Sequence, residues 1–262
     1  MTSRSHHVDY DQVAATYDQR YARGAPAGIG EALSGIAAEI HAERVLEVGC
    51  GTGQWLALLA GGGRRLYGVD LSNAMLERAH ARVPALALIR GHADQLAFAR
   101  ASFDLVFCVH ALHHFDAPRE FVSAAHRLLR PGGAIAVIGM NPHAGRDRWY
   151  IYDYFPGTYE TDLRRYPSPG AIIDWMIAAG FGITGWRVAA RIIDTRAGRA
   201  VWNDPILQKN GTSQLTLLSD EAYTAGLARI EAALMRAGAA GESVIFPVDI
   251  SLALVWGRVP QG

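Results

Sequence analysis

The sequence predicts an α/β protein with a doubly wound sheet, in which helices cover both faces of parallel strands. Short apolar runs rich in β-branched residues alternate with longer amphipathic segments, as such a sheet requires. The clearest run, Val45–Val48, is followed by glycines at positions 49, 51 and 53. A second run, Leu66–Val69, ends at Asp70.

Each expected element follows from this alternation and from local start and stop signals. Strands are expected near residues 43–48, 65–70, 86–91, 103–109 and 133–140, then within 181–194 and at 244–257. Helices are expected near 9–22, 26–41, 53–60, 72–82 and 117–129. Ser168 followed by Pro169 predicts a helix start, and Gly180 predicts its end. Another predicted helix starts at Ser219, reaches about Arg236 and stops at Gly238.

The glycine turn and Asp70 together predict a site for a nucleotide-type cofactor. Because Gly49, Gly51 and Gly53 lack side chains, backbone N–H groups can approach a ligand closely before a helix begins near Gln54. Asp70 is delivered to the same edge of the sheet, where its carboxylate can accept two hydrogen bonds from ribose hydroxyls.

The spacing of the glycines separates two classes of cofactor site. A dinucleotide site of the Gly-x-Gly-x-x-Gly type needs glycine at position 54, which is Gln54 here, so a nicotinamide-dependent dehydrogenase is disfavoured. The observed Gly-x-Gly-x-Gly, with Glu47 two residues before the first glycine, resembles the class I S-adenosylmethionine-dependent methyltransferases.

Three further motifs occur in the order found in that family. Gly91–Asp94 resembles the loop after the third strand, Phe103–Phe115 the fourth strand with a His-rich loop, and Leu128–Ile138 the turn into the fifth strand. Over roughly residues 9–140 the chain therefore resembles the type 11 subgroup of these methyltransferases. The resemblance implies a Rossmann-like, seven-stranded sheet in the order 3-2-1-4-5-7-6, with the last strand antiparallel.

The resemblance also implies which residues surround S-adenosylmethionine, whose product is S-adenosylhomocysteine. Glu47 is expected near the methionine part, Asp70 at the ribose and Asp94 at the adenine amino group. Leu71 and Met75 are expected on the adenine faces. The complete expected cofactor set is Tyr17, Glu47, Gly49, Cys50, Gly51, Gly53, Asp70, Leu71, Met75, Ala93, Asp94, Gln95 and Val109.

Length and composition favour a single methyltransferase domain over residues 1–262. It would comprise an N-terminal helical cap (1–42), a cofactor-binding core (43–140) and two insertions (141–167 and 195–242). The 25 basic and 25 acidic residues balance, so no overall charge recruits nucleic acid. No apolar stretch resembles a signal peptide or a membrane span, so we expect a cytoplasmic protein without a membrane partner.

The two cysteines, Cys50 and Cys108, are too few for a disulfide scaffold and lack the spacing of metal ligands. We therefore expect reduced packing residues and no metal site. Both a monomer and a homodimer are compatible with the sequence.

The two insertions indicate where the methyl acceptor binds. Both leave the carboxyl edge of the predicted sheet, and the first is rich in aromatic residues, so we expect a lid with an aromatic-lined pocket for a small, partly planar acceptor. The alternative is that these aromatics only pack the insertion. Tyr10, Tyr17 and Tyr21 share one face of the N-terminal helix. The candidate acceptor-binding residues are Tyr21, His114, Trp149, Tyr152, Tyr154 and Trp202.

The expected chemistry is in-line displacement of a methyl group from a sulfonium, for which proximity, alignment and exclusion of water supply most of the acceleration. A base helps if the acceptor is a hydroxyl. His110, just beyond the fourth strand, is the first candidate, and His143 is the second. His113 and His114 belong to a string that is common in the subgroup across unrelated substrates, which favours a structural role for both.

Two other functions stay open. A tRNA methyltransferase has related motifs but needs a basic surface, which Arg187, Arg191, Arg196 and Arg199 would have to supply locally. A non-catalytic protein that binds S-adenosylmethionine would keep the cofactor motifs and transfer no methyl group.

Overall fold

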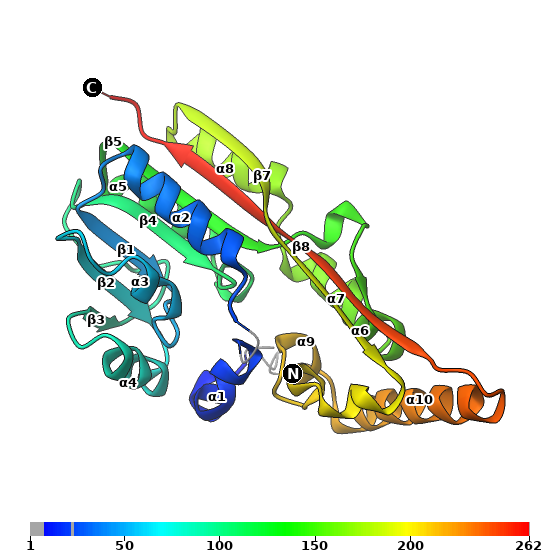
Figure 1. The fold of residues 1–262 in the computed structure, drawn as a ribbon. Helices are drawn as coiled ribbons and strands as arrows, with labels where there is room; N and C mark the ends of the chain where they lie inside the picture. The colour runs from blue at the N-terminus through cyan, green and yellow to red at the C-terminus, as the bar shows by residue number, and fades with distance from the viewer. Residues whose placement is uncertain (1–7, 22–23, 262) are drawn as a thin grey trace, which may run out of the picture. The chain divides into compact units, whose positions relative to one another are not determined.

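The computed structural model describes residues 8–21 and 24–261 (Figure 1). Contacts divide the chain into two compact units. The sheet unit consists of the described residues of Pro26–Asn141, Tyr166–Ala190 and Leu252–Gly262. The insertion unit consists of those of Met1–Ala25, Pro142–Arg165 and Arg191–Ser251. That residues 1–262 form one domain stays a prediction.

The sheet has eight strands among the described residues, in the order β3-β2-β1-β4-β5-β8-β6, with β7 also paired to β8. Strands β1 to β5 pair in parallel, and β8 is antiparallel to β5 and β6. The predicted strand order is confirmed once the additional two-residue strand β6 is set aside. The strands are β1 (Arg44–Val48), β2 (Arg65–Asp70), β3 (Ala87–Arg90), β4 (Phe103–Val109), β5 (Leu129–Met140), β6 (Arg148–Trp149), β7 (Ile183–Ala197) and β8 (Ile245–Arg258).

Helices connect the strands in the predicted alternation. Ser168 accepts a hydrogen bond from the Ala171 N–H at the start of α8, and Gly180 ends this helix with φ 104°, as expected. The α-helices are α1 (Tyr10–Tyr17), α2 (Ala27–Glu39), α3 (Gln54–Leu58), α4 (Asn73–Arg82), α5 (Pro118–Leu128), α6 (Tyr150–Tyr154), α7 (Thr158–Arg165), α8 (Pro169–Ala179), α9 (Ser213–Thr216) and α10 (Asp220–Ala239). The 3₁₀ helices are η1 (Asp18–Tyr21), η2 (Leu112–His114), η3 (Pro142–Ala144), η4 (Gly198–Asn203) and η5 (Pro205–Leu207).

Apolar residues at helical spacing place α5 against the sheet. Phe121, Val122, Ala125 and Leu128 recur every three or four residues and are fully buried in the core formed with apolar residues of β1, β4 and β5. Burial of each large apolar side chain of this kind contributes about 1.5–3 kcal/mol. This core supports the strands whose carboxyl ends carry the candidate site.

The parallel register brings several strand ends to one edge of the sheet. Val48, the last residue of β1, pairs with Val69 of β2, and β4 ends at Val109. The glycine turn after β1, Asp70 at the end of β2 and His110 after β4 therefore all lie at the carboxyl edge.

Asp104 of β4 fixes the opposite edge. Its Oδ2 accepts hydrogen bonds from the backbone N–H groups of Glu43 (3.0 Å) and Arg44 (2.8 Å), where β1 begins. Its Oδ1 lies 3.0 Å from Nη1 of Arg130 in β5. One carboxylate thus links three adjacent strands at their starting ends.

The start of β5 differs from the prediction. The turn expected at Pro131 and Gly132 lies inside the strand, which begins at Leu129. The pairing of β4 with β5 shifts register between Phe103 and Leu105, so an irregularity absorbs these residues without ending the strand.

Two helix ends also differ. α10 passes through Gly238 and ends at Ala239, because the glycine that adopts the left-handed conformation is Gly241 (φ 69°). The predicted N-terminal helix is α-helical only to Tyr17 and continues as the 3₁₀ helix η1 to Tyr21, while residue 22 lies outside the described residues.

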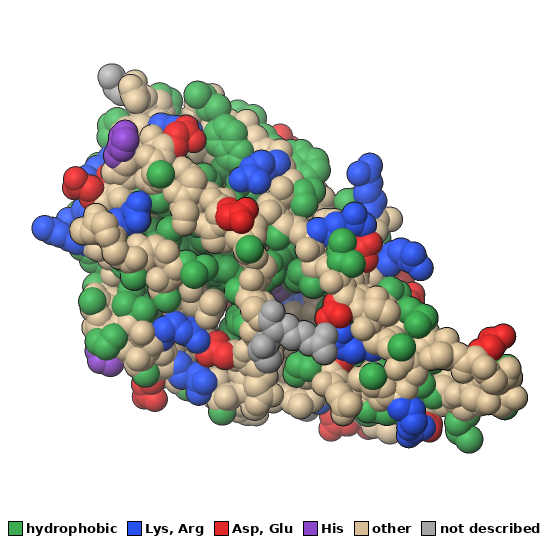
Figure 2. Space-filling model, viewed as in Figure 1, with side chains coloured by type: hydrophobic (Ala, Val, Ile, Leu, Met, Phe, Trp, Pro, Cys, Tyr) green, Lys and Arg blue, Asp and Glu red, His purple; other side chains and the backbone are tan. Residues whose placement is uncertain are grey.

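The cysteines and the distribution of surface charge agree with what the composition predicts. Cys50 and Cys108 are free and buried, which confirms that they are packing residues. On the face shown in Figure 2, basic and acidic side chains are interspersed. Within the described residues, no helix combines the length and the apolar character needed to cross a membrane.

We predict opposite effects for two Gly-to-Ala substitutions in α10. A Cβ at Gly226 would overlap the Phe155 ring, so Gly226→Ala should lower the free energy of unfolding by about 1–3 kcal/mol. Gly238 has open space around its Cβ position, so Gly238→Ala should raise it by up to about 1 kcal/mol through helix propensity alone. Urea denaturation measures both, and equal effects of the two substitutions would contradict this packing of α10.

Candidate functional site

The turn after β1 is built from glycines in left-handed conformations. Gly49, Gly51 and Gly53 have φ values of 72°, 51° and 70°, which residues with a Cβ rarely adopt. A Cβ on Gly49 would lie 2.5 Å from the Cβ of Ala111 in the loop after β4. The turn therefore packs directly against that loop.

Asp70 holds this turn from the end of β2. Its Oδ2 accepts the Gly51 N–H (2.8 Å), and its Oδ1 accepts the Ser72 N–H (3.0 Å). The Val69 carbonyl also accepts hydrogen bonds from the N–H groups of Gly49 (2.8 Å) and Cys50 (3.0 Å). The carboxylate predicted to bind ribose thus also fixes the backbone of the glycine turn.

Glu47 is a fully buried carboxylate beside Asp70. Neither of its oxygens has a well-formed hydrogen bond among the described residues. Burial raises the pKa of Glu47 well above its usual range, Asp70 raises it further, and the Leu56 backbone N–H lowers it in part. Burial, followed by the nearby acids, also raises the pKa of the Cys50 thiol. A bound positive charge would favour the ionised form of Glu47 and so offset the effect of burial and of Asp70 on its pKa.

The residues expected around adenine differ in accessibility. Leu71 has 52% of its surface exposed beside Asp70, so it offers an apolar face to a planar ligand. Met75 is 1% exposed, which leaves it no accessible surface. Ala93 is half-buried, whereas Asp94 and Gln95 are exposed. Val109 is buried at the end of β4.

These features fit the cofactor that the sequence resemblance implies. S-adenosylmethionine carries a positive sulfonium and an ammonium, and the buried Glu47 carboxyl group, which has no well-formed hydrogen bond, lies near that of Asp70. The glycine turn presents backbone without side-chain bulk, and Leu71 offers an exposed apolar surface. The individual contacts remain predictions.

His110 has an unusual backbone at the end of β4. Its φ is 52°, in the left-handed region, which costs a residue with a Cβ about 1–2 kcal/mol. Its N–H donates a hydrogen bond to the Ile138 carbonyl of β5 (2.8 Å), which holds the residue in place. Strain of this kind clusters at functional sites.

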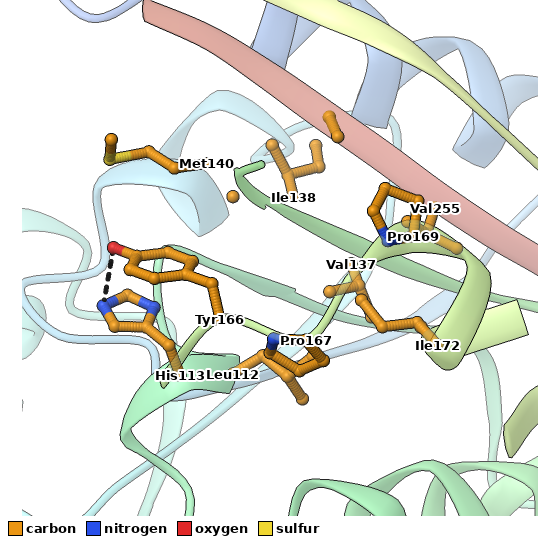
Figure 3. A pocket seen from close by; sticks show the side chains of 12 residues that line it. Leu112, His113, Val137, Ile138, Met140, Tyr166, Pro167, Pro169, Ile172 and Val255 are labelled. Atoms are coloured by element: carbon orange, nitrogen blue, oxygen red, sulfur yellow. Dashed lines mark hydrogen bonds between the residues drawn. The ribbon is translucent and has the colours of Figure 1, made fainter. Parts of the chain in front are cut away.

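His113 and Tyr166 form a pair that sequence reasoning missed. The Tyr166 hydroxyl lies 3.0 Å from Nε2 of His113, and the two rings stack with centroids 3.9 Å apart (Figure 3). The His114 ring centroid lies 4.0 Å from that of His113. Fifty-three positions separate the partners, so no local pattern could have revealed the pair.

The pair lies at a narrow cavity of about 30 Å³ at the ends of β4 and β5 (Figure 3). Apart from the pair, its lining side chains are apolar, and none of them is Asp, Glu, Lys or Arg. The lining residues are Leu112, His113, Val137, Ile138, Gly139, Met140, Tyr166, Pro167, Pro169, Ile172, Ala253 and Val255.

The other candidate residues belong to the insertion unit. Tyr17 packs edge-on against Tyr10 (6.1 Å) and Tyr21 (6.5 Å), and the Arg20 guanidinium lies 3.8 Å from the Tyr17 ring centroid. His143 is exposed in η3. Their predicted contacts with cofactor and acceptor stay predictions.

The aromatic residues of the insertions divide between packing and an open pocket. Trp149 is 4% exposed, Tyr154 packs against Phe246, and Trp202 has a buried indole nitrogen without a described partner. The Tyr152 hydroxyl donates to the buried Asp162 carboxylate (2.8 Å). Tyr152 also lines an open pocket of about 480 Å³ with Pro142, Gly145, Asp147, Pro156, Gly157, Tyr159 and Glu160.

Comparison with known proteins supports the methyltransferase family that the sequence motifs resemble. The family described as "Methyltransferase domain" matches residues 46–137. An uncharacterised methyltransferase of Synechocystis is 30% identical over 168 residues, covering 61% of this chain and 78% of that protein. A ubiquinone biosynthesis O-methyltransferase of Pseudomonas aeruginosa is 31% identical over 160 residues, covering 56% of this chain and 67% of that protein.

A solved structure supports the fold. A protein from an antibiotic biosynthesis pathway of Anabaena variabilis matches with a TM-score of 0.66 at 22% identity, covering 89% of this chain and 97% of that chain. The family match extends from β1 to β5, and most of the Synechocystis protein is covered. The chain therefore belongs to the class I S-adenosylmethionine-dependent methyltransferases and carries a type 11 methyltransferase domain.

Proposed function

We propose that this S-adenosylmethionine-dependent methyltransferase acts on a small aromatic or heterocyclic molecule by in-line displacement. The observation that carries this proposal is the buried Glu47 carboxyl group near Asp70 at the glycine turn, which has no well-formed hydrogen bond and suits a cationic cofactor. The Pseudomonas relative, named for O-methylation in ubiquinone biosynthesis, supports a small acceptor.

In this proposal the chain's residues bind and orient the cofactor. The backbone of the glycine turn and Glu47 hold its methionine part, Asp70 holds the ribose, and Leu71 covers one adenine face while Asp94 contacts the amino group. When bound, the cofactor supplies a methyl group on a positively charged sulfur. Alignment of the acceptor and exclusion of water are then the protein's main contributions.

His110 is the proposed contact between the chain and the acceptor. It follows β4 directly, its backbone is held by the Ile138 carbonyl, and the positive φ sets its side-chain direction. An imidazole at this position can orient an acceptor through a hydrogen bond. His143 remains the second candidate.

The structure gives no support to a tRNA acceptor, because most of the arginines that would have to form a basic surface are paired with acids. Arg191 pairs with Asp249, Arg199 pairs with Glu231 (3.0 Å), and Arg196 pairs with Asp194 and Asp204. Because the charges of these arginines are matched by acids, they form no strong positive field.

The proposed function is tested by methyl transfer to phenols, heteroaromatic amines and thiols, followed as S-adenosylhomocysteine formation. Turnover with an aromatic or heterocyclic member is expected. Tight cofactor binding without turnover on any of them would favour the non-catalytic alternative.

Asp70→Ala should weaken S-adenosylmethionine binding at least tenfold, about 1.4 kcal/mol or more, because it removes both the ribose acceptor and the anchor of Gly51. Calorimetry measures the affinity, with NAD as a control ligand. Asp174→Ala, which removes an exposed carboxylate of α8, should leave it unchanged. Unaltered affinity of Asp70→Ala would contradict the site.

Affinity for S-adenosylmethionine should rise as the pH is raised above the ordinary carboxyl range. The free protein holds Glu47 protonated to an unusually high pH, whereas a bound cation favours the carboxylate, so binding releases a proton. Glu47→Gln should flatten this dependence. Calorimetry in buffers of different ionisation enthalpy detects the released proton, and a proton count of zero in the wild type would refute the coupling.

Ionisation of Glu47 at higher pH favours cofactor binding but opposes folding. Because the pKa of Glu47 is raised in the folded state, its unfavourable contribution grows as pH rises from the ordinary carboxyl range towards the raised value. At pH values above the ordinary carboxyl range, Glu47→Gln should therefore be more stable than the wild type by about 1–3 kcal/mol. Denaturation at several pH values checks this, and a pH-independent difference would contradict it.

His110→Gly and His110→Ala should both lower methyl turnover and differ in stability. Alanine keeps the Cβ that strains the left-handed backbone, so the glycine variant should be more stable than the alanine variant by about 1 kcal/mol. Thermal denaturation and turnover assays measure the two effects. A full-rate alanine variant would remove His110 from the mechanism.

A further inference from the structure

The loop that carries His113 lies directly against the glycine turn. The Cβ position of Gly49 is 2.5 Å from Ala111 Cβ and 3.4 Å from Cε1 of Phe115. Within the loop, the His114 N–H bonds to the Ala111 carbonyl (2.8 Å) and the Phe115 N–H to the Leu112 carbonyl (3.1 Å). His113 is therefore held on a short, tightly turned segment beside the proposed cofactor site.

Tyr166 meets this segment from the connection between α7 and α8. It is 6% exposed, its ring stacks on His113, and its hydroxyl is directed at Nε2 (Figure 3). When Nε2 carries no proton, the Tyr166 hydroxyl donates to it, and the lone pairs of the phenol oxygen can accept a further hydrogen bond. In that tautomer, a proton can pass from the phenol oxygen to Nε2.

We propose that Tyr166 and His113 form the relay that receives the acceptor's proton, and that the acceptor group is therefore a hydroxyl on an uncharged, largely apolar molecule of the phenol class. This inference rests on the proposed methyltransferase function. The cavity at the pair, at about 30 Å³, has room for a hydroxyl group and not for a whole ring, and apart from the pair its lining is apolar and includes no Asp, Glu, Lys or Arg. Such surroundings favour a neutral hydroxyl over an ammonium or a carboxylate.

The proposed step balances as follows. The acceptor oxygen forms a bond to the methyl carbon while the carbon–sulfur bond breaks, and its electron pair stays on sulfur. The acceptor's proton passes to the Tyr166 oxygen as the Tyr166 proton passes to Nε2 of His113. The resulting imidazolium later releases a proton to water.

The test uses the full chain with S-adenosylmethionine and phenols of increasing acidity, from 4-methoxyphenol to 4-nitrophenol, in mildly alkaline buffer. Tyr166→Phe keeps the stacked ring and removes the hydroxyl. It should slow methylation of 4-methoxyphenol about 10²–10⁴-fold, the usual contribution of acid–base catalysis. The loss should nearly vanish for 4-nitrophenol, which is largely ionised in this buffer and has no proton to transfer.

Two further variants separate the relay from a structural role. His113→Gln retains a hydrogen-bond acceptor but takes up no proton near neutral pH, so it should show the same dependence on phenol acidity. Tyr67→Phe, which removes a hydroxyl elsewhere in the sheet unit, should leave all rates unchanged. Cofactor affinity should stay within twofold for every variant.

The possible failures are distinguishable. Equal rate losses across the phenols would show that Tyr166 only supports the structure, and full-rate methylation of 4-methoxyphenol by Tyr166→Phe would overturn the relay. Methylation of amines or thiols alone would overturn it while leaving the proposed function intact. Absence of transfer to every phenol, amine and thiol would overturn both.

Discussion

The arrangement of the site depends on the Asp70 carboxylate. Its two oxygens accept backbone N–H groups from Gly51, in the turn after β1, and from Ser72, which in turn caps α4 through the Met75 N–H (3.1 Å). The Asp70 carboxylate at the end of β2 therefore connects the turn after β1 to helix α4, which follows β2. Ribose binding would use a group whose position the backbone already fixes, so little reorganisation is required.

Glu47 illustrates the conflict between stability and function at this edge. A fully buried carboxylate without a well-formed hydrogen bond opposes folding, and the nearby Asp70 adds electrostatic repulsion. The surrounding sheet tolerates this because burial of its apolar core supplies the compensating stability. Local violations of the rules for burying polar groups are characteristic of binding sites, where the ligand supplies the missing partner.

The loop after β4 contains a second conflict between stability and function. His110 adopts a left-handed backbone, Ala111 packs against Gly49, and His113 meets Tyr166, all within four consecutive positions of one loop. One short segment thereby links the glycine turn to the proposed proton relay. The aromatic residues of the insertion unit, such as Trp149 and Tyr152, are largely engaged in their own packing and hydrogen bonds.

The sequence by itself determined the glycine turn and the positions of Glu47 and Asp70 at one sheet edge, because hydrophobic periodicity and glycine spacing are local properties. The strand order came from the family resemblance, and the structure confirms it. It misplaced the ends of β5 and α10, where a register irregularity and the choice of left-handed glycine decide the boundary. Only the tertiary structure decided that Asp70 binds Gly51, that Glu47 lacks a well-formed partner and that Tyr166 reaches His113. Each depends on how segments distant in sequence pack, and no local pattern encodes that.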